Sequence, residues 1–361
     1  MFIITNRHVD ASKTGPAILG ARPNELGSNE LRVVEATRRG RGWSLDVLPD
    51  ELTAAQKREI GMTSAEGTLY ASTYASRKVL QEARKAGKNI LVFVHGYNND
   101  ITAILNRADH LEKAYGVIVV CFSWPARGGG ARGTLSYRED KRDAKASIGG
   151  FERFLVIARN HLDDMNEGAK QAAMAKAEKE HPEDNERRDM RFQELMDKAC
   201  PVKISMMLHS MGNYLLKHTI MSSTSAEIGA LFSNIVLVAA DTNNIGHPGW
   251  VDRLRAREAV YITINEQDRA LRASEVKIGD AQRARLGRTR RNLDSIQGIY
   301  VDVTDAPSVG RSHAYFEGDA AAPRSALRGF FHRILNGERG EESLPFNAGT
   351  GAYKVGTRRR R

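Results

Sequence analysis

Cysteine is scarce in this sequence. The 361 residues include only Cys121 and Cys200, and each lies in or beside an apolar run. Two such residues do not build the disulfide framework of a small secreted domain, and we interpret both as small core residues. The N-terminal stretch lacks the charged start, long apolar centre and cleavage site of a signal peptide. We therefore expect a protein of the reducing cytoplasm.

Long hydrophobic runs and metal-binding motifs are also lacking. No apolar stretch approaches the roughly 18 residues that a membrane-spanning helix needs. The histidines form no His-Glu-x-x-His segment and the cysteines form no Cys-x-x-Cys pair, so the sequence does not indicate a zinc site. The glycines at 128–130 lack the Lys-Ser/Thr of a phosphate-binding loop. We expect neither a metal nor an organic cofactor.

The chain has ordinary globular composition with a strong excess of positive charge. Hydrophobic residues make up 41% and charged residues 27%, which suits a sizeable core, and the net charge is +10. Arginines gather at 283–291 and again at 358–361. A nucleic acid or an anionic membrane surface is compatible with this charge but is not favoured, because no aromatic residues interleave with the arginines. A solvated basic loop and a disordered tail are the simpler interpretation.

Short β-branched runs alternate with helical patterns along most of the chain. The runs lie at 90–94, 117–122, 202–208, 235–240, 260–264 and 299–303. They are apolar almost throughout, which is typical of strands buried on both faces of a parallel sheet. Apolar residues at helical spacing fill the segments between them, so the pattern predicts an α/β fold with βαβ crossovers. Shorter runs at 2–5, 31–36 and 43–48 predict antiparallel strands at one edge of this sheet.

The organisation predicted is one domain with extensions. Residues 1–60 supply the N-terminal edge strands, residues 61–340 form the core, and residues 341–361 form a basic, disordered tail. A charged, alanine-rich insertion at about 163–198 reads as two helical pieces separated at Pro182. This insertion and a glycine-rich loop at 128–133 are candidate covers for a site at the sheet edge, and a partner-binding arm is the alternative for the insertion.

The most informative segment joins the strand at 202–208 to a helix beginning near Asn213, with Ser210 in the turn. A nucleophile elbow needs this context, because the sharp turn lifts the serine hydroxyl above the sheet edge. Gly212 lets the helix pack close to the strand. Leu208 departs from the usual Gly-x-Ser-x-Gly pattern, since it puts a bulky residue in place of the first glycine. A serine that only caps the helix is the alternative.

A second segment, His95-Gly96-Tyr97, ends another buried strand. Acyl transfer needs two backbone N–H donors aimed at the developing oxyanion. We expect them to be the N–H groups of Tyr97 and Met211, with Gly96 permitting the close approach. The alternative is a plain strand-to-helix turn capped by Asp100, and both roles can coexist.

These motifs recur with others in a fixed order. They are His95-Gly96-Tyr97-Asn98-Asn99, Ser123-Trp124-Pro125, His209-Ser210-Met211-Gly212-Asn213 and a late His313. Together they resemble an uncharacterised bacterial branch of the α/β-hydrolase superfamily, over about residues 90–316. The resemblance implies a mostly parallel central sheet with helices on both faces. Leu208 departs from this branch, which usually has alanine there. We expect the site to be lined by His95, Gly96, Asn98, Trp124, His209 and Asp241.

The resemblance also implies where the acid and the histidine lie. In this superfamily the chain order is nucleophile, acid, histidine, and the acid usually follows the strand after next from the elbow. That position is Asp268, in a segment similar to the Asp-x-Ala-Leu of the related branch. Asp241 and Glu266 are the rivals. The histidine expected after the last strand is His313, with His332 as its rival.

The function expected is hydrolysis of a carboxylic ester through an acyl-enzyme on Ser210, with His313 as general base and Asp268 as the acid that orients it. The substrate would be a small-molecule ester. An acyltransferase or thioesterase with the same triad, or a non-catalytic scaffold of this fold that binds an anionic partner, are the alternatives. The sequence does not indicate an oligomeric state.

Overall fold

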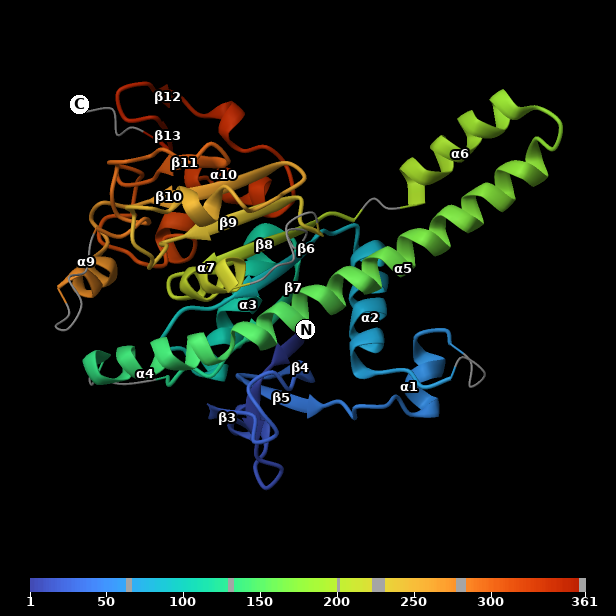
Figure 1. Cartoon of the computed structure of the whole chain (residues 1–361), viewed down its shortest axis with the longest axis horizontal. Coiled ribbons are helices and arrows are strands. Elements are labelled where there is room, and N and C mark those ends of the chain that lie inside the picture. Colours follow the sequence, from blue (N-terminus) through green and yellow to red (C-terminus); the bar gives the residue numbers. More distant parts are fainter. Residues whose placement is uncertain (63–66, 129–132, 200–201, 223–230, 277–283, 357–361) are drawn as a thin grey trace.

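The computed structural model describes residues 1–62, 67–128, 133–199, 202–222, 231–276 and 284–356. Its centre is an 11-stranded sheet in the order β12-β13-β11-β10-β9-β8-β6-β7-β1-β4-β5 (Figure 1). The strands are β1 (Phe2–Thr5), β4 (Arg32–Arg39), β5 (Gly42–Val47), β6 (Ile90–Val94), β7 (Ile118–Ser123), β8 (Ile204–His209), β9 (Asn234–Val238), β10 (Ala259–Ile264), β11 (Gly298–Asp302), β12 (Phe346–Asn347) and β13 (Ala352–Lys354). Neighbouring strands from β13 to β1 run parallel. The mostly parallel α/β fold expected from the sequence is confirmed.

Helices cover both faces of the sheet. They are α1 (Ala54–Glu59), α2 (Ala71–Ala86), α3 (Ile101–Tyr115), α4 (Gly133–Ala146), α5 (Ile148–Glu180), α6 (Asn185–Ala199), α7 (Gly212–Ser222), α8 (Pro248–Val251), α9 (Arg269–Glu275) and α10 (Ala326–Leu335). Residues of α3 and α10 share one core cluster, and residues of α5, α7 and α8 share another. The helix at 133–146 had no counterpart in the sequence prediction, because its charged pattern gives a weak apolar stripe.

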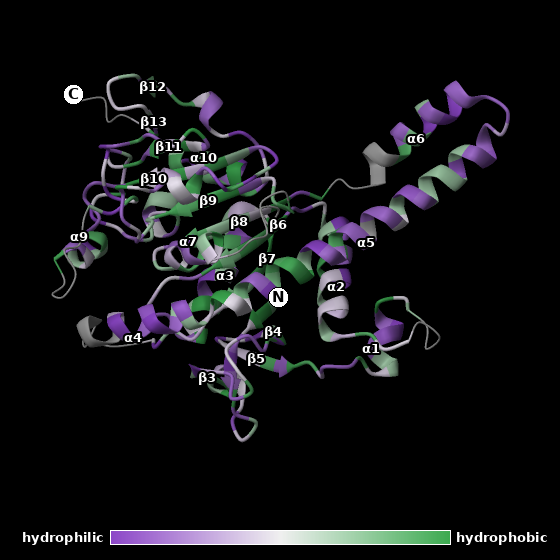
Figure 2. Cartoon of the chain, in the orientation of Figure 1, coloured by the Kyte–Doolittle hydropathy of each residue, from purple (hydrophilic) through white to green (hydrophobic). Residues whose placement is uncertain are grey.

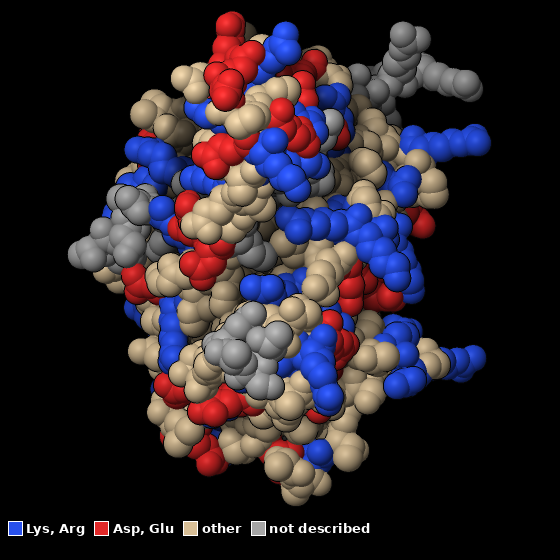
Figure 3. Space-filling model, turned by 90° about the vertical axis from the view of Figure 1, so that its right-hand side faces the viewer, with Lys and Arg blue, Asp and Glu red and all other residues tan. Residues whose placement is uncertain are grey.

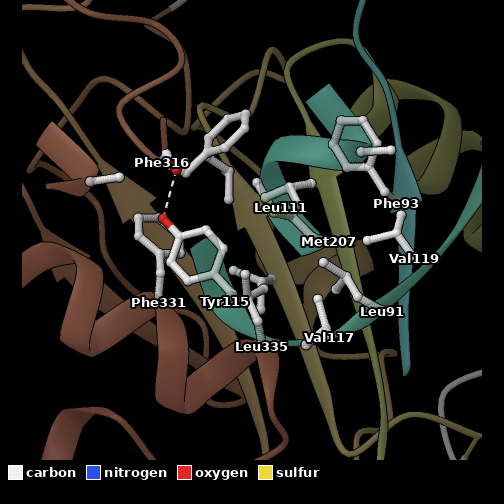
Figure 4. Close-up of a cluster of buried hydrophobic side chains, with 14 of the residues drawn as sticks. Leu91, Phe93, Leu111, Tyr115, Val117, Val119, Met207, Phe316, Phe331 and Leu335 are labelled. Carbon is white, nitrogen blue, oxygen red and sulfur yellow. Dashed lines mark hydrogen bonds between the residues drawn. The ribbon is translucent and has the colours of Figure 1, made fainter. Parts of the chain in front are cut away.

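The strands supply both core clusters by alternation. In β6, Leu91 and Phe93 belong to the cluster under α3 and α10, whereas Val92 and Val94 belong to the cluster under α7. Figure 4 shows the first cluster, with the Tyr115 hydroxyl donating to the Phe316 carbonyl at 2.6 Å. Side chains on both faces of β6 are buried because successive residues of a strand point to opposite faces. This explains why the run at 90–94 is apolar throughout, and Figure 2 shows the same hydrophobic colour along the central strands.

The N-terminal strands differ from the prediction in one respect. Strands β4 and β5 pair antiparallel, but β1 lies between β7 and β4 and pairs parallel with β7. Strand β1 also pairs antiparallel with β4, so the antiparallel N-terminal strands are confirmed, but β1 is an interior strand and not the edge strand that was expected. Phe2 and Ile3 are 1% and 0% exposed on opposite faces, so β1 is buried as an interior strand is. A separate pair, β2 (Arg7–Val9) and β3 (Leu19–Pro23), follows it.

The C-terminal segment was wrongly predicted to be a tail from residue 341. Strand β13 pairs parallel with β11, and β12 pairs antiparallel with β13, so the chain adds to the sheet after α10. Ala352 and Val355 are buried. These two strands were not predicted because they are short and their few apolar residues stand isolated among polar ones. Residues 357–361, with the terminal arginines, lie outside the described residues.

The insertion consists of two helices, α5 and α6, separated at 181–184 around Pro182. Helix α5 runs without a break from Ile148 to Glu180, so the segment from residue 163 continues a helix that begins earlier in the chain. We call residues 163–199 the arm. Figure 1 shows the arm projecting away from the sheet, and Figure 3 looks onto that side, where acidic and basic side chains intermingle. The arm rejoins the sheet just before β8 begins.

A cavity of about 660 Å³ lies between α2, α5 and the amino-terminal halves of several strands. Its lining includes Ile4, Leu80, Ile90, Phe154, Ile204 and Phe232. None of the residues expected in the catalytic site lines this cavity. None of the helices in the described segments combines the length and the hydropathy that a membrane span requires.

Candidate active site

Strand β8 and helix α7 meet in a sharp turn with Ser210 at its apex. Ser210 has φ of 54°, a left-handed conformation that costs a residue other than glycine about 1–3 kcal/mol. The turn is held by hydrogen bonds from Ser210 N–H to the Val238 carbonyl at 3.0 Å and from Asn213 Nδ2 to the Leu208 carbonyl at 3.0 Å. Among the described residues no N–H donates to Ser210 Oγ, so the hydroxyl does not cap α7. The geometry is that of a nucleophile elbow.

Leu208 fits this turn because its side chain is directed into the core. It is 0% exposed and belongs to the cluster that includes Val94 and Leu215. Gly212 supplies the close approach instead, since a Cβ there would lie 2.9 Å from the carbonyl oxygens of Val94 and His95. The close packing of strand and helix thus depends on Gly212, two residues after the serine, and not on a glycine at position 208.

The loop after β6 lies directly against the nucleophile. A Cβ on Gly96 would meet Ser210 Cβ at 2.7 Å and Ser210 Oγ at 3.3 Å, so only glycine fits without displacement. The backbone on either side of Gly96 is therefore close to the serine hydroxyl. Asp100 caps α3 through a bond from Ala103 N–H at 2.8 Å, so the capping role coexists with this approach. The backbone of this loop and the first turn of α7 meet at Ser210.

His95 and Trp124 support this loop from within the fold. Both are 0% exposed, their rings stack with centroids 5.0 Å apart, and Trp124 Nε1 donates to the His95 carbonyl at 3.0 Å. The His95 Nδ1 atom lies 2.7 Å from the Gly96 carbonyl oxygen. Burial, with the nearby charge of Arg7, lowers the pKa of His95 to about 3. The ring is thus neutral at pH 7. Asn98 has φ of 56°, and its N–H donates to Asp140 at 3.0 Å.

Asp268 and His313 come together from different loops. Asp268 follows β10 at the N-terminus of α9, and its Oδ1 accepts the Leu271 N–H at 3.0 Å. Its Oδ2 lies 2.7 Å from Nδ1 of His313. Asp268 is 0% exposed, so this contact is shielded from water. The carboxylate therefore fixes the His313 ring with Nδ1 as donor and leaves Nε2 to accept a proton.

The Nε2 atom of His313 is buried and has no hydrogen-bond partner among the described residues. The hydroxyl of Ser210 is thus not bonded to it in this conformation. In hydrolases without substrate such bonds are often long and shorten in the complex. The ring lies at the elbow, because its centroid is 4.7 Å from that of His209, the residue before Ser210.

His209 holds the backbone that carries His313. Its Nε2 lies 3.1 Å from the His313 carbonyl oxygen, and its ring packs edge-on against Phe316 at 5.2 Å. Burial, and then the neighbouring His313, keep the pKa of His209 well below its usual value. A neutral His209 therefore donates Nε2–H to the loop. His209 is therefore a structural residue of the elbow.

The rival acids and the rival histidine have other positions. Asp241 pairs with Arg285 at 3.1 Å, and Glu266 pairs with Arg290 at 3.1 Å. His332 is exposed on α10. Of these, only Asp241 adjoins the elbow, through its N–H to the Ser210 carbonyl at 3.3 Å.

Several residues that position the site were missed by the sequence analysis. Asn265 donates to the carbonyls of Gly310 and Ser312 at 3.0 and 2.9 Å, which ties the loop of Asp268 to that of His313. Tyr315 hydroxyl accepts from the Ala239 N–H at 3.1 Å. Single polar residues in loops carry no periodic signal, so nothing in the sequence pattern marked them.

Arg7 is a further buried support. It is 1% exposed and donates to Ser123 Oγ at 2.9 Å, and to carbonyls that include those of Ala126 at 3.1 Å and Asn99 at 3.3 Å. These bonds join the N-terminal segment to the loops after β6 and β7. Burial lowers the pKa of Arg7 to about 10.

The arginine run at 283–291 does not form the solvated loop expected. Arg285 is 5% exposed and paired with Asp241, Arg288 lies 2.7 Å from Glu275, and Arg290 lies 2.8 Å from Asp302. The acids that pair with these arginines lie outside the run in sequence, so the sequence alone did not indicate that the positive charge is neutralised. Arg283 and residues 129–132 of the glycine-rich loop lie outside the described residues. No group of side chains in the described part of the chain could hold a metal ion.

The parallel sheet and the elbow define an α/β hydrolase. The chain belongs to the family described as "alpha/beta hydrolase of unknown function (DUF900)", whose model matches residues 72–166 and 177–317. The matched segments contain the elbow, the loop after β6, Asp268 and His313. No curated protein and no solved structure matches the chain.

Proposed function

We propose that this protein hydrolyses a carboxylic ester through an acyl-enzyme on Ser210. The observation that carries the proposal is the 2.7 Å contact between Asp268 and His313, placed beside an elbow whose serine has φ of 54°. A strained serine next to an imidazole that a buried carboxylate orients is an arrangement that activates a hydroxyl. The fold without this arrangement would not indicate a reaction.

In the proposed reaction Ser210 Oγ attacks the ester carbonyl carbon while His313 Nε2 takes the hydroxyl proton. The carbonyl electron pair moves to oxygen, and the N–H groups of Tyr97 and Met211 receive the oxyanion. Collapse breaks the bond to the alcohol oxygen, which takes the proton back from Nε2. Water then repeats the sequence on the acyl-enzyme and releases the acid. Asp268 remains ionised and stabilises the imidazolium in both halves.

The test uses a serine-directed fluorophosphonate probe and a panel of 4-nitrophenyl esters. Wild type should be labelled once and should hydrolyse at least one ester, whereas Ser210→Ala should lose both properties and keep its melting temperature. His313→Ala should lower kcat by about 10⁴-fold or more. Labelling that persists in Ser210→Ala would contradict the proposal. A folded wild type with neither labelling nor turnover would favour the non-catalytic scaffold.

A further inference from the structure

A buried polar cluster adjoins the elbow and takes no part in the proposed acyl transfer. Asp241 follows β9, and its N–H donates to the Ser210 carbonyl at 3.3 Å. Its carboxylate accepts the Tyr137 hydroxyl at 3.0 Å and the Ser274 hydroxyl at 2.8 Å. Arg285 Nε lies 3.1 Å from the same carboxylate. These residues come from α4, α9 and two loops, so tertiary structure alone assembles the cluster beside the nucleophile.

One donor of Arg285, Nη2, has no acceptor among the described residues. Its Nε donates to Ser274 Oγ at 2.9 Å and its Nη1 to Asn243 Oδ1 at 2.8 Å. Its Nη2 is buried and has no hydrogen-bond partner among the described residues, and the whole residue is 5% exposed. Both carboxylate oxygens of Asp241 already accept hydrogen bonds. A buried guanidinium donor without an acceptor costs free energy, so an oxygen from a ligand would complete this site.

Further positive charge lies on the same side of the elbow. Tyr214 and Lys217 stand four and seven residues beyond Ser210, about one and two turns along α7. Lys141 of α4 lies over the Tyr214 ring, with Nζ 5.1 Å from its centroid. Burial lowers the pKa of Lys217, and the charges of Lys141 and Arg285 lower it further. Three cations, Lys141, Lys217 and Arg285, therefore lie near Asp241, while Glu275 accepts the Arg285 N–H at 2.9 Å and pairs with Arg288. Among the described residues no acid forms an ion pair with Lys217.

We propose that Arg285 and Lys217 form an anion subsite, and that Ser210 acts preferentially on esters whose acyl chain ends in a carboxylate. The Nη2 group of Arg285 can donate to one oxygen of a carboxylate, and Lys217 adds a second positive charge. Lys217 lies seven residues beyond Ser210, which along a helix is about 10 Å, and this suits a carboxylate a few methylene groups from the ester. The reaction in this inference rests on the proposed ester hydrolysis, whereas the binding does not.

The test compares esters matched in length. Mono-4-nitrophenyl esters of succinate, glutarate and adipate are set against the 4-nitrophenyl esters of neutral straight-chain acids with the same number of carbons. We expect wild type to show at least tenfold higher kcat/KM for the best anionic ester, and added salt to reduce this ratio. A ratio of one or less at every length would overturn the subsite.

Variants separate charge from folding. Lys217→Gln should lower the anionic-to-neutral ratio at least fivefold, and Lys217→Arg should restore most of it. Arg285→Gln is made together with Asp241→Asn, so that no buried carboxylate is left unpaired. Lys170→Gln on the arm is the matched control and should leave the ratio unchanged. An unchanged ratio in both the Lys217→Gln and the double variant, each folded by its melting curve, would also overturn the subsite.

Direct binding distinguishes failure of the subsite from failure of the proposed reaction. Calorimetric titration with adipate needs no turnover, and wild type should bind it at least fivefold more tightly than Lys217→Gln does. If no ester is hydrolysed and no serine is labelled, such binding still supports the subsite while ester hydrolysis fails. If neutral esters are hydrolysed but adipate does not bind, the subsite is wrong and the hydrolysis stands.

Discussion

At the residue scale, Asp268 illustrates how one carboxylate serves two elements. One oxygen caps α9 through Leu271 N–H, and the other holds Nδ1 of His313. The side chain is fully buried, so neither oxygen turns to solvent. The orientation of His313 is thus coupled to the start of a helix, and a change at Asp268 affects the imidazole without leaving a cavity.

We predict that Asp268→Asn lowers kcat/KM for a hydrolysed ester by about 10⁴-fold. The amide can still cap α9, but its NH₂ group favours the wrong imidazole tautomer. Glu266→Gln is the matched control, since Glu266 pairs with Arg290 and should be replaceable within twofold. Ester kinetics and melting curves of both variants give the comparison. Equal losses in the two variants would argue against Asp268 as the orienting acid.

His95 should make stability depend on pH. Its pKa falls from a reference value of 6.5 to about 3 in the folded protein, chiefly through burial. Between these two pKa values, His95 therefore binds a proton in the unfolded chain but not in the folded protein. The contribution of the neutral His95 ring to the free energy of unfolding is fully present above about pH 6.5. It is lost as the pH falls toward 3, at about 1.4 kcal/mol per pH unit. His209 acts in the same direction.

Urea unfolding at pH 6, 5 and 4 measures this slope. His95→Gln should be less stable at pH 7 but should show a slope shallower by about 1.4 kcal/mol per pH unit than that of wild type. His332→Gln, at an exposed position of α10, should keep the wild-type slope. An unaltered slope in His95→Gln would show that the buried ring is not the source.

At the scale of elements, the site depends on how closely the loop after β6 and the turn before α7 approach each other. Gly96 and Gly212 make this contact possible, because a Cβ on either would lie within 3.0 Å of the opposite segment. Real Cβ atoms do not tolerate such distances, so a side chain must push the two segments apart. The hydroxyl and the expected oxyanion donors would then lose their mutual position.

We predict that Gly96→Ala lowers kcat by at least about 10²-fold, the loss typical of one displaced oxyanion-hole donor. Gly168→Ala is the control, since nothing lies within 4 Å of its added Cβ in α5. That substitution should leave kcat unchanged and add about 0.5–1 kcal/mol of stability. Kinetics and unfolding curves decide the matter. A Gly96→Ala enzyme of full activity would place the oxyanion donors elsewhere.

At the scale of the whole molecule, the arm and the site lie at different ends of the sheet. The arm leads into the amino end of β8, whereas Ser210 follows its carboxyl end. The core of the arm consists of small contacts between its own helices, where Ala173 and Ala177 are buried. This placement argues against the arm as a lid over the site.

We predict that replacing residues 170–195 by a four-residue glycine–serine turn leaves ester turnover within about twofold and the melting temperature within a few degrees. The two helices run antiparallel, so the ends of the excised segment lie near each other. Of the described side chains in the excised segment only Ala173 and Ala177 are buried, so little of the core is lost with them. A tenfold loss of kcat/KM in a folded variant would restore the arm as a cover for the site.

Much of the fold could be predicted from the local sequence. The central strands are apolar on both faces, and the turn at Ser210 lies between a strand and a helix with Gly212 beside it. Such signals can be read because they depend on neighbours in sequence. The interior position of β1, the strands β12 and β13, and the pairing of Arg285 with Asp241 could not be read in this way.

The sequence by itself determined the parallel sheet, the elbow and the loop after β6, because strand periodicity and turn residues act over a few neighbouring positions. Only the tertiary structure decided that Asp268 rather than Glu266 lies at His313, that Asn265 ties their loops together, and that Arg285 is buried beside the elbow. Each of these contacts joins residues that sequence distance leaves independent, and burial from water selects which polar groups must pair.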